Sequence, residues 1–429
     1  MNNNMNVQLS RRNFLEMMGA LGAATALGSC TNSSSKTNTT VGAPVATTTL
    51  RAPGGSAPKP TPGFGGRSLV VIEMGGGNDG LTTVVPHGLA GFGALRTSVV
   101  LKPEELLSLD ANVGLHPNLK ALHARGVAVV QGVGVAKPDG SHFDMSARWW
   151  AGDPDGKGTY PTGIFGRIAD VIGDDCPAVA IALNGVSQSI ITARATSISL
   201  SDPNAGDFLT NNDKGQYDAF QAGFNGMTTG ARTDTPIMAA ARKGLLDASH
   251  FARHLGALPD VTEGYPGHEL AQSLAMAARL LSANIGTRII HVNHGQNFDT
   301  HQNHLDQHAN NMTALDESVD AFLRDLEARG LADKVLVMTT SEFGRRATDN
   351  GSTGLDHGAA SVALLMGAVK PGLYGQYSSL TKLDDDQNLV ATTNMIDYHG
   401  TVAQGWFGVH ATDVLEGSPT VIPGMFAAV

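Results

Sequence analysis

Cysteine, positive charge and long apolar runs are all scarce in this 429-residue chain. Its two cysteines, Cys30 and Cys176, are too few for a disulfide framework. The formal net charge is -10, and no basic stripe is available to neutralise phosphates, which excludes nucleic acid as an expected partner. Beyond the N-terminal segment, no apolar stretch reaches the roughly 18 residues that a transmembrane helix needs. The length suits one large α/β domain or two smaller ones.

The first 29 residues have the features of an export signal. Residues 10–15, SRRNFL, form a twin-arginine motif, and a short apolar stretch at 17–27 is typical of a signal-peptide core. Residues 27–30, LGSC, resemble a bacterial lipobox, in which Cys30 becomes the lipidated N-terminus; the alternative is a buried cysteine in an ordinary helix. We therefore expect the twin-arginine export machinery as a partner. The expected location is the periplasm or an outer-membrane-anchored lipoprotein of a bacterium, with membrane contact only through the lipid.

The remaining chain divides into a tether and one folded domain. Residues 30–66 are Ser, Thr, Ala, Pro and Gly with hardly a large apolar side chain, which predicts a disordered tether. The folded domain is expected at 67–429, with a polar, Gly- and Asn-rich excursion at about 201–234. Buried strands are predicted at 68–74, 126–134, 177–183, 287–292, 335–340 and 361–366 from their apolar, β-branched runs. Helical spacing predicts helices at 268–283 and 305–329, and a closing helix at 402–409.

Polar side chains follow these strands at the points where the strands end. Asp79 lies in GGGNDG after the first strand, where a plain turn is the alternative; the G-x-G-x-x-G spacing is absent, which argues against a dinucleotide. Ser141 stands at the start of a helix, and is either its N-cap or a nucleophile. Asp299 and His301, with His304 and His308 close behind, form the densest cluster of metal-ligand types in the chain.

A second polar stretch lies between the strands at 335–340 and 361–366. It carries Glu342 and Arg345 in SEFGR, and Asp356 and His357 in GLDHG. Ligand sites of open α/β sheets lie at the carboxyl ends of the strands, so these groups are expected to converge; a solvated loop with helix caps is the alternative. Carboxylates and imidazoles together indicate one or two divalent metal ions, so Glu342, Asp356 and His357 are expected metal ligands beside Asp299 and His301. A metal site beside a helix-capping hydroxyl is suited to displacement at phosphorus or sulfur, and Arg345 is expected to hold the anion.

The motifs GGNDG, GSHFDMSARWW, DTH, SEFGR and GLDHG, behind a twin-arginine leader, resemble the exported bacterial family called domain of unknown function 1501. The resemblance covers about residues 68–428. That family in turn resembles the alkaline phosphatase and sulfatase superfamily, which implies a three-layer α/β/α sandwich with a mixed, mostly parallel central sheet. The resemblance also implies that Asp79 is a metal ligand and that Ser141 is the nucleophile. It further implies that Asp299, His301 and His357 bind one metal ion.

Two departures from the superfamily pattern affect the expected metal site. Glu342-Phe343 stands where the superfamily has an Asp-His pair, and the spacing from Asp299 to its histidine is short. Either Asp356 or a neighbouring histidine fills the gap, or one metal is lost. Thr82 and Thr83 remain alternative nucleophiles.

The expected function is that of an exported metal-dependent hydrolase acting on a small-molecule or glycan ester of phosphate or sulfate. The metal is zinc, manganese, calcium or magnesium, since mixed nitrogen and oxygen ligands suit several ions. The alternative is a non-catalytic cell-envelope binding protein with a degenerate metal site. A phosphotransferase or mutase is a third hypothesis, disfavoured by export to a compartment poor in nucleotides.

Overall fold

The computed structural model describes residues 66–173, 178–200 and 263–427, with a few positions between 226 and 251. Within these residues one nine-stranded sheet has the order β11-β5-β10-β9-β1-β8-β6-β7, and β12 pairs with β5. The strands are β1 (Ser68–Glu73), β5 (Ala128–Gly134), β6 (Ala180–Leu183), β7 (Ser197–Leu200), β8 (Ile289–Asn293), β9 (Val335–Thr340), β10 (Ser361–Gly367), β11 (Gly372–Tyr374) and β12 (Thr393–Asn394).

The direction of the strands brings the polar loops to one edge of the sheet. β1 pairs in parallel with both β8 and β9, and β6 pairs in parallel with β8 and β7. Among the described strands of this sheet, only β10 runs antiparallel, against β5 and β9. The carboxyl ends of β1, β5, β8 and β9 therefore lie at the same edge as the amino end of β10. This edge is where the sequence places its polar motifs.

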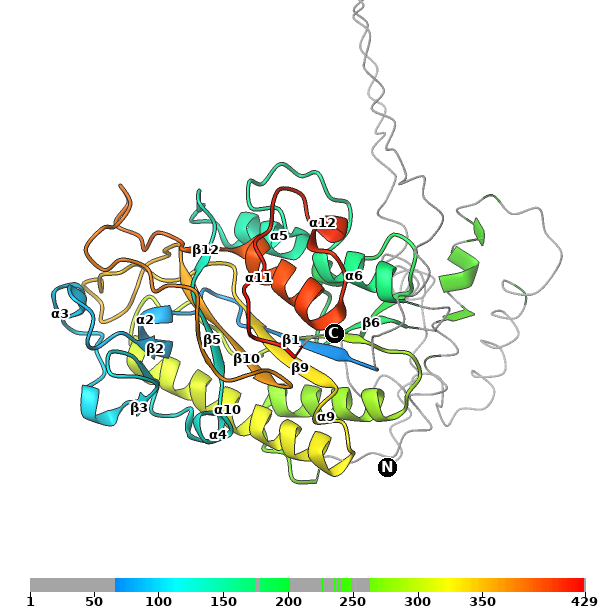
Figure 1. Cartoon of the computed structure of the whole chain (residues 1–429), viewed down its shortest axis with the longest axis horizontal. Helices are drawn as coiled ribbons and strands as arrows, with labels where there is room; N and C mark the ends of the chain where they lie inside the picture. The colour runs from blue at the N-terminus through cyan, green and yellow to red at the C-terminus, as the bar shows by residue number, and fades with distance from the viewer. Residues whose placement is uncertain are drawn as a thin grey trace, which may run out of the picture.

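Helices cover both faces of the sheet (Figure 1). One face carries α4 (Lys120–Arg125), α9 (Glu269–Ser282) and α10 (His304–Ala328). The other carries α5 (His142–Ala151), α6 (Ile164–Ile172), α11 (Met395–Thr401) and α12 (Ala411–Val414). Alternate residues of β1 enter the two cores: Val70 packs on one side and Val71 on the other, because side chains of a strand point to opposite faces. The predicted three-layer α/β/α sandwich with a mixed, mostly parallel sheet is confirmed.

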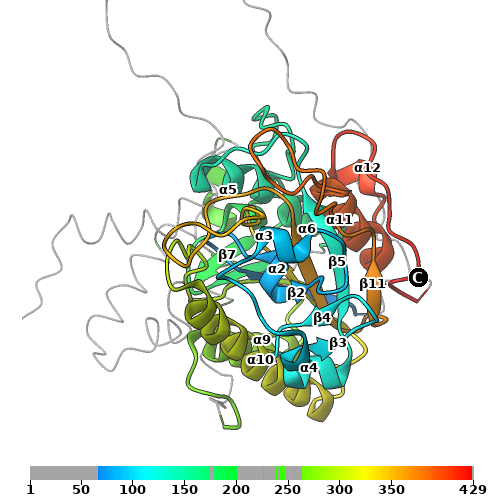
Figure 2. The same ribbon diagram turned by 90° about the vertical axis from the view of Figure 1, so that its left-hand side faces the viewer.

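A small accessory region lies at one end of the large sheet, and this end faces the viewer in Figure 2. It contains α2 (Gly80–Thr83), α3 (Phe92–Leu95) and a three-stranded antiparallel sheet of β2 (Val84–Val85), β4 (Gly114–Leu115) and β3 (Leu107–Ser108). The closing segment differs slightly from its prediction. It begins earlier, with α11, and continues as a π-helical turn, η4 (Val402–Trp406), while Trp406 and Phe407 are buried as expected.

Some predictions concern residues outside the described ranges. They are Cys30 with the lipobox, Cys176, the tether at 30–66 apart from Gly66, and the excursion at 201–234 apart from Gly226. Among the residues that the structure describes, no helix is long and apolar enough to cross a membrane.

Candidate metal centre

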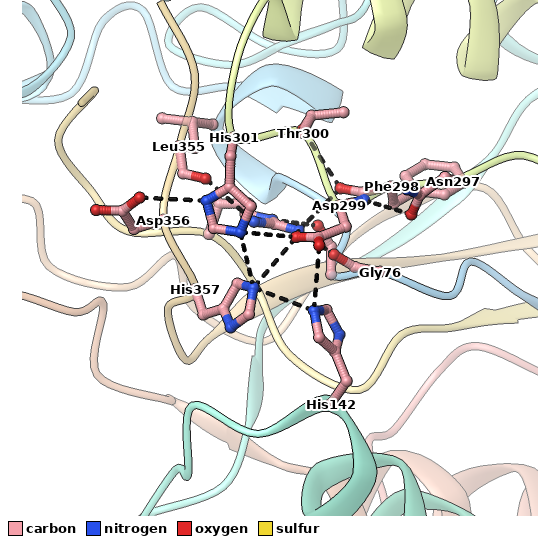
Figure 3. A network of polar contacts seen from close by, with 12 residues as sticks. Gly76, His142, Asn297, Phe298, Asp299, Thr300, His301, Leu355, Asp356 and His357 are labelled. Atoms are coloured by element: carbon pink, nitrogen blue, oxygen red, sulfur yellow. Dashed lines mark hydrogen bonds and ion pairs between the residues drawn. The ribbon is translucent and has the colours of Figure 1, made fainter. Parts of the chain in front are cut away.

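Four side chains converge at the carboxyl edge of the sheet (Figure 3). His142 is the first residue of α5, Asp299 and His301 lie in the loop between β8 and α10, and His357 precedes β10. Their side chains are 31%, 32%, 46% and 23% exposed, respectively. The group is therefore ordered by the fold yet open to solvent, as a site that receives a ligand must be.

His142, Asp299 and His357 have ligand atoms that all lie within 4.8 Å of one another, as expected around one metal ion, and His301 adjoins two of them. Nε2 of His357 lies 3.1 Å from Nε2 of His142, 3.0 Å from Nε2 of His301 and 3.1 Å from Oδ1 of Asp299. Nε2 of His301 is 3.0 Å from the same carboxylate oxygen. A tetrahedral zinc ion with bonds of about 2.0–2.2 Å would hold its ligand atoms roughly 3.3 Å apart.

In each imidazole, the hydrogen-bond partner of Nδ1 determines whether Nε2 carries a hydrogen or a lone pair. Nδ1 of His357 faces the carbonyl oxygen of Gly140 at 2.7 Å, Nδ1 of His142 faces Oε1 of Glu342 at 2.8 Å, and Nδ1 of His301 faces Oδ1 of Asp356 at 3.3 Å. A carbonyl and ionised carboxylates only accept, so each Nδ1 carries the hydrogen.

In a neutral ring, Nε2 then carries a lone pair, which points toward the other ligand candidates. Lone pairs about 3 Å apart repel unless a cation lies between them, so the donor set fits a divalent metal.

Asp299 is fixed by Arg345, whose side chain is buried. The guanidinium donates to Oδ1 of Asp299 at 2.6 Å and to the carbonyl oxygens of Gly76, Gly77, Phe298 and Leu355. Burial by itself raises the pKa of Asp299, but the hydrogen bond and charge of Arg345 outweigh it and leave the pKa below its usual value. Asp299 is therefore an ionised ligand candidate.

Glu342 lies beneath the group. Its carboxylate is almost completely buried and accepts hydrogen bonds from the backbone N–H groups of Gly76 at 2.8 Å and Gly77 at 3.3 Å, in addition to His142. Gly76 has φ +112°, and an added Cβ there would lie 2.4 Å from the backbone nitrogen of Asp299. A glycine is thus required where the loop after β1 passes under the metal candidates.

Asp79 does not join this group. It is 1% exposed, caps α2 by accepting from the N–H of Leu81 at 3.3 Å and accepts from Arg96 at 2.8 Å. Burial raises the pKa of Asp79, but the charge of Arg96 and the contact with His304 more than offset this and hold the pKa far below its usual range. Asp79 therefore belongs to a separate buried cluster with Arg96 and His304.

The hydroxyl candidates are divided between the two clusters. Ser141 is the N-cap of α5, where Oγ accepts from the N–H of Asp144 at 3.4 Å. It stands in the chain between Gly140, which holds His357, and His142, so it adjoins the metal group. Thr82 is buried and donates to Asp79; Thr83 is buried and bonds to Asn78 at 2.9 Å.

Three other histidines are buried and lie outside the group of metal-ligand candidates. His304 and His308 are on α10 and fully buried, and His308 contacts Thr83 at 3.1 Å. His399 is buried as well, and burial lowers its pKa to about 3, which fits a structural role. His142 was missed by sequence reasoning, which weighed only Ser141 at this helix start. The available signal was a histidine in the first turn of a helix that follows a buried strand.

A family model described as "Protein of unknown function (DUF1501)" matches residues 207–403. The predicted family resemblance is confirmed. The DUF1501 match contains the DTH, SEFGR and GLDHG motifs, whereas Asp79 and His142 precede it. A twin-arginine translocation signal sequence matches residues 8–28, so the chain carries a signal for export out of the cytoplasm. No curated protein matches the chain.

Solved structures similar to this chain include the lipoteichoic acid synthase LtaP from Listeria monocytogenes. It is 11% identical, with 82% of this chain and 74% of that chain covered and a TM-score of 0.38. The periplasmic domain of EptC from Escherichia coli, in complex with zinc, is 10% identical, covers 79% and 82%, and has a TM-score of 0.36. A mutant of the TAB5 alkaline phosphatase with bound magnesium is 13% identical, covers 72% and 94%, and has a TM-score of 0.36.

Proposed function

We propose that this exported protein is a metal-dependent hydrolase of phosphate or sulfate esters. The observation that supports it is the convergence of His142, His301, His357 and Asp299 at the solvent-open carboxyl edge of the sheet. Imidazole nitrogens with one carboxylate suit zinc better than calcium or magnesium, which prefer oxygen ligands. We therefore propose zinc, held by these four residues.

A bound zinc ion would supply Lewis-acid polarisation of the ester oxygen and lower the pKa of a nearby hydroxyl or water. The remaining roles fall to residues of the chain. Arg345 keeps Asp299 ionised and directed at the centre. Ser141 is the proposed nucleophile because it adjoins both Gly140 and His142; a water molecule is the alternative.

One ion suffices for this arrangement. Asp79 is engaged by Arg96, and Phe343 is buried with its ring stacked 4.8 Å from that of His357, in the place where the superfamily pattern has a histidine. Asp79 is thus paired with another side chain, and Phe343 offers no ligand atom for a second ion. We propose a mononuclear centre.

The test is release of phosphate and sulfate from aryl esters by the zinc-loaded protein. We expect turnover in the wild type and at least a hundredfold loss in His357→Ala. His410→Ala, at an exposed histidine before α12, is the control and should retain full activity. An unchanged rate in His357→Ala would contradict the proposal.

The non-catalytic binding protein remains the second candidate, and the buried Phe343 favours it because that side chain offers no ligand to a second ion. It predicts stoichiometric zinc that is lost in His357→Ala, without turnover of any ester. Measurement of zinc content beside the ester assay therefore separates the two functions.

A further inference from the structure

We propose that Glu342 is a positioning residue that sets the metal-binding tautomer of His142, and is not itself a metal ligand. The inference builds on the proposed metal centre and assigns a role to the one carboxylate beneath it. It concerns how the chain prepares its ligands, whichever ester is hydrolysed.

The oxygens of Glu342 are already engaged by the protein. Oε1 accepts from the N–H of Gly76 at 2.8 Å and from Nδ1 of His142 at 2.8 Å. Oε2 accepts from the N–H of Gly77 at 3.3 Å, and the hydroxyl of Ser341 lies 3.3 Å from it. A carboxylate has about four acceptor directions, and N–H donors use three of them, since the hydroxyl of Ser341 has a nearer acceptor in the carbonyl oxygen of Met74 at 2.9 Å. Both oxygens are thus engaged by the protein, which favours a positioning role over metal ligation.

The contact with His142 has a chemical consequence at the other side of the ring. A buried carboxylate 2.8 Å from Nδ1 accepts the hydrogen of Nδ1, so Nε2 of the neutral ring presents its lone pair toward His357 and Asp299. The opposite tautomer would direct an N–H at the ion and remove one ligand. Glu342 therefore decides whether His142 can bind.

The same carboxylate also fixes the position of the ring. It links three segments that are distant in the sequence: the glycine loop after β1, the end of β9 and the first turn of α5. The ring of His142 additionally lies 4.8 Å from that of Phe343, next to Glu342 in the chain. His142 consequently has little freedom to turn away from the centre.

The other two imidazoles provide an internal comparison. His357 is held by the backbone carbonyl of Gly140, which no substitution removes. His301 is held by Asp356 at 3.3 Å, and that carboxylate is 49% exposed, whereas Glu342 is 4% exposed. The hydrogen bond from His142 to Glu342 is shorter and more buried than that from His301 to Asp356, and is therefore the stronger one. Glu342→Gln should accordingly weaken metal binding more than Asp356→Asn.

The experiment measures zinc affinity of the full-length protein by competition with a chromophoric chelator. Glu342→Gln should bind zinc about 10- to 100-fold more weakly than the wild type. Asp316→Asn is the matched control, because Asp316 is a buried carboxylate that accepts two backbone N–H bonds, from Ala121 and Leu122, without an imidazole. Its zinc affinity should be unchanged. Equal affinity in Glu342→Gln and wild type would overturn the proposal.

Cobalt substitution distinguishes a positioning residue from a ligand. At saturating Co²⁺, Glu342→Gln should show the absorption bands of the wild type, since the set of ligands is the same. His142→Ala, which removes a ligand, should change their position and intensity. A spectrum of Glu342→Gln altered as strongly as that of His142→Ala would show that Glu342 binds the metal directly, and the proposal would fail.

Nitrogen-15 NMR of the wild-type histidines tests the tautomer without any Glu342 variant. The His142 signals are assigned by their absence in His142→Ala. We expect hydrogen on Nδ1 and none on Nε2; the reverse tautomer would refute the assignment. This result does not depend on turnover, so an inactive protein with the expected tautomer would refute the hydrolase and keep the role of Glu342.

Discussion

The role of Asp79 depends on its partner: with a metal ion it would be a ligand, and with an arginine it forms a buried ion pair. The loop GGGNDG predicted a metal ligand, but Arg96, seventeen residues further on, reaches the carboxylate at 2.8 Å. Both side chains are almost completely buried. The pairing depends on the path of the chain through α3, which no local pattern encodes.

Asp79→Asn should therefore destabilise the protein without removing its metal. Breaking a buried ion pair from one side leaves an uncompensated charge and costs about 3–5 kcal/mol of the free energy of unfolding. Chemical denaturation at pH 7 measures this loss, and zinc stoichiometry should stay at the wild-type value. Loss of zinc in a folded Asp79→Asn protein would mean that Asp79 is a ligand after all.

The pH dependence of stability provides a second readout for Asp79. Its pKa in the folded protein lies below the unfolded value of about 4, so its stabilising contribution is complete above that value and is lost as pH falls below it. Wild-type stability should decline below about pH 4, and Asp79→Asn should show a shallower decline. Parallel curves for the two proteins would contradict the assignment.

Ser141 can be tested as cap and as nucleophile with two substitutions. Ser141→Ala removes an N-cap and should cost about 1 kcal/mol, whereas Ser141→Gly should cost only a few tenths. If Ser141 is the nucleophile, both variants lose ester hydrolysis to the same extent, regardless of this difference in stability. If hydrolysis persists in both, water is the nucleophile and Ser141 only caps α5.

At the scale of elements, the glycine loop between β1 and α2 places the ligands most directly. An added Cβ at Gly76 would meet the backbone of Asp299, while at Gly75 nothing lies within 4 Å. Gly76→Ala should therefore displace Asp299 and reduce zinc affinity by at least tenfold, with Gly75→Ala as the matched control. Chelator competition measures both, and equal affinities would show that the loop can move without affecting the centre.

The sequence predicted the elements better than the residues that complete the site. Buried strands such as β9 carry β-branched runs whose boundaries are visible in the sequence, and α10 has a long apolar stripe. No helix was predicted at α6, because Gly163 gives no side-chain cap at its start. Which way His142 points from the first turn of α5 depends on Glu342, two hundred residues away, and so required the structure.

At the scale of the whole molecule, the centre joins parts of the chain that are far apart. His142 lies after β5, Asp299 and His301 after β8, and His357 before β10, so one ion would hold three loops at one edge of the sheet. The twin-arginine signal is consistent with such a site being assembled in the cytoplasm before export. Binding to the folded form alone would make the proposed ion a stabiliser of the fold.

Removal of zinc should therefore lower the stability of the folded domain. At a free zinc concentration of 100 times Kd the expected stabilisation is about 2.7 kcal/mol. For a domain of this size that corresponds to a rise in Tm of roughly 3–5 °C. Scanning calorimetry with and without zinc measures it, and the Asp299→Ala, His357→Ala double variant should show no shift while His410→Ala shows the full one. A zinc-dependent shift of equal size in the double variant would place the ion elsewhere in the molecule, because those two substitutions remove ligands from two of the three loops that the ion is proposed to join.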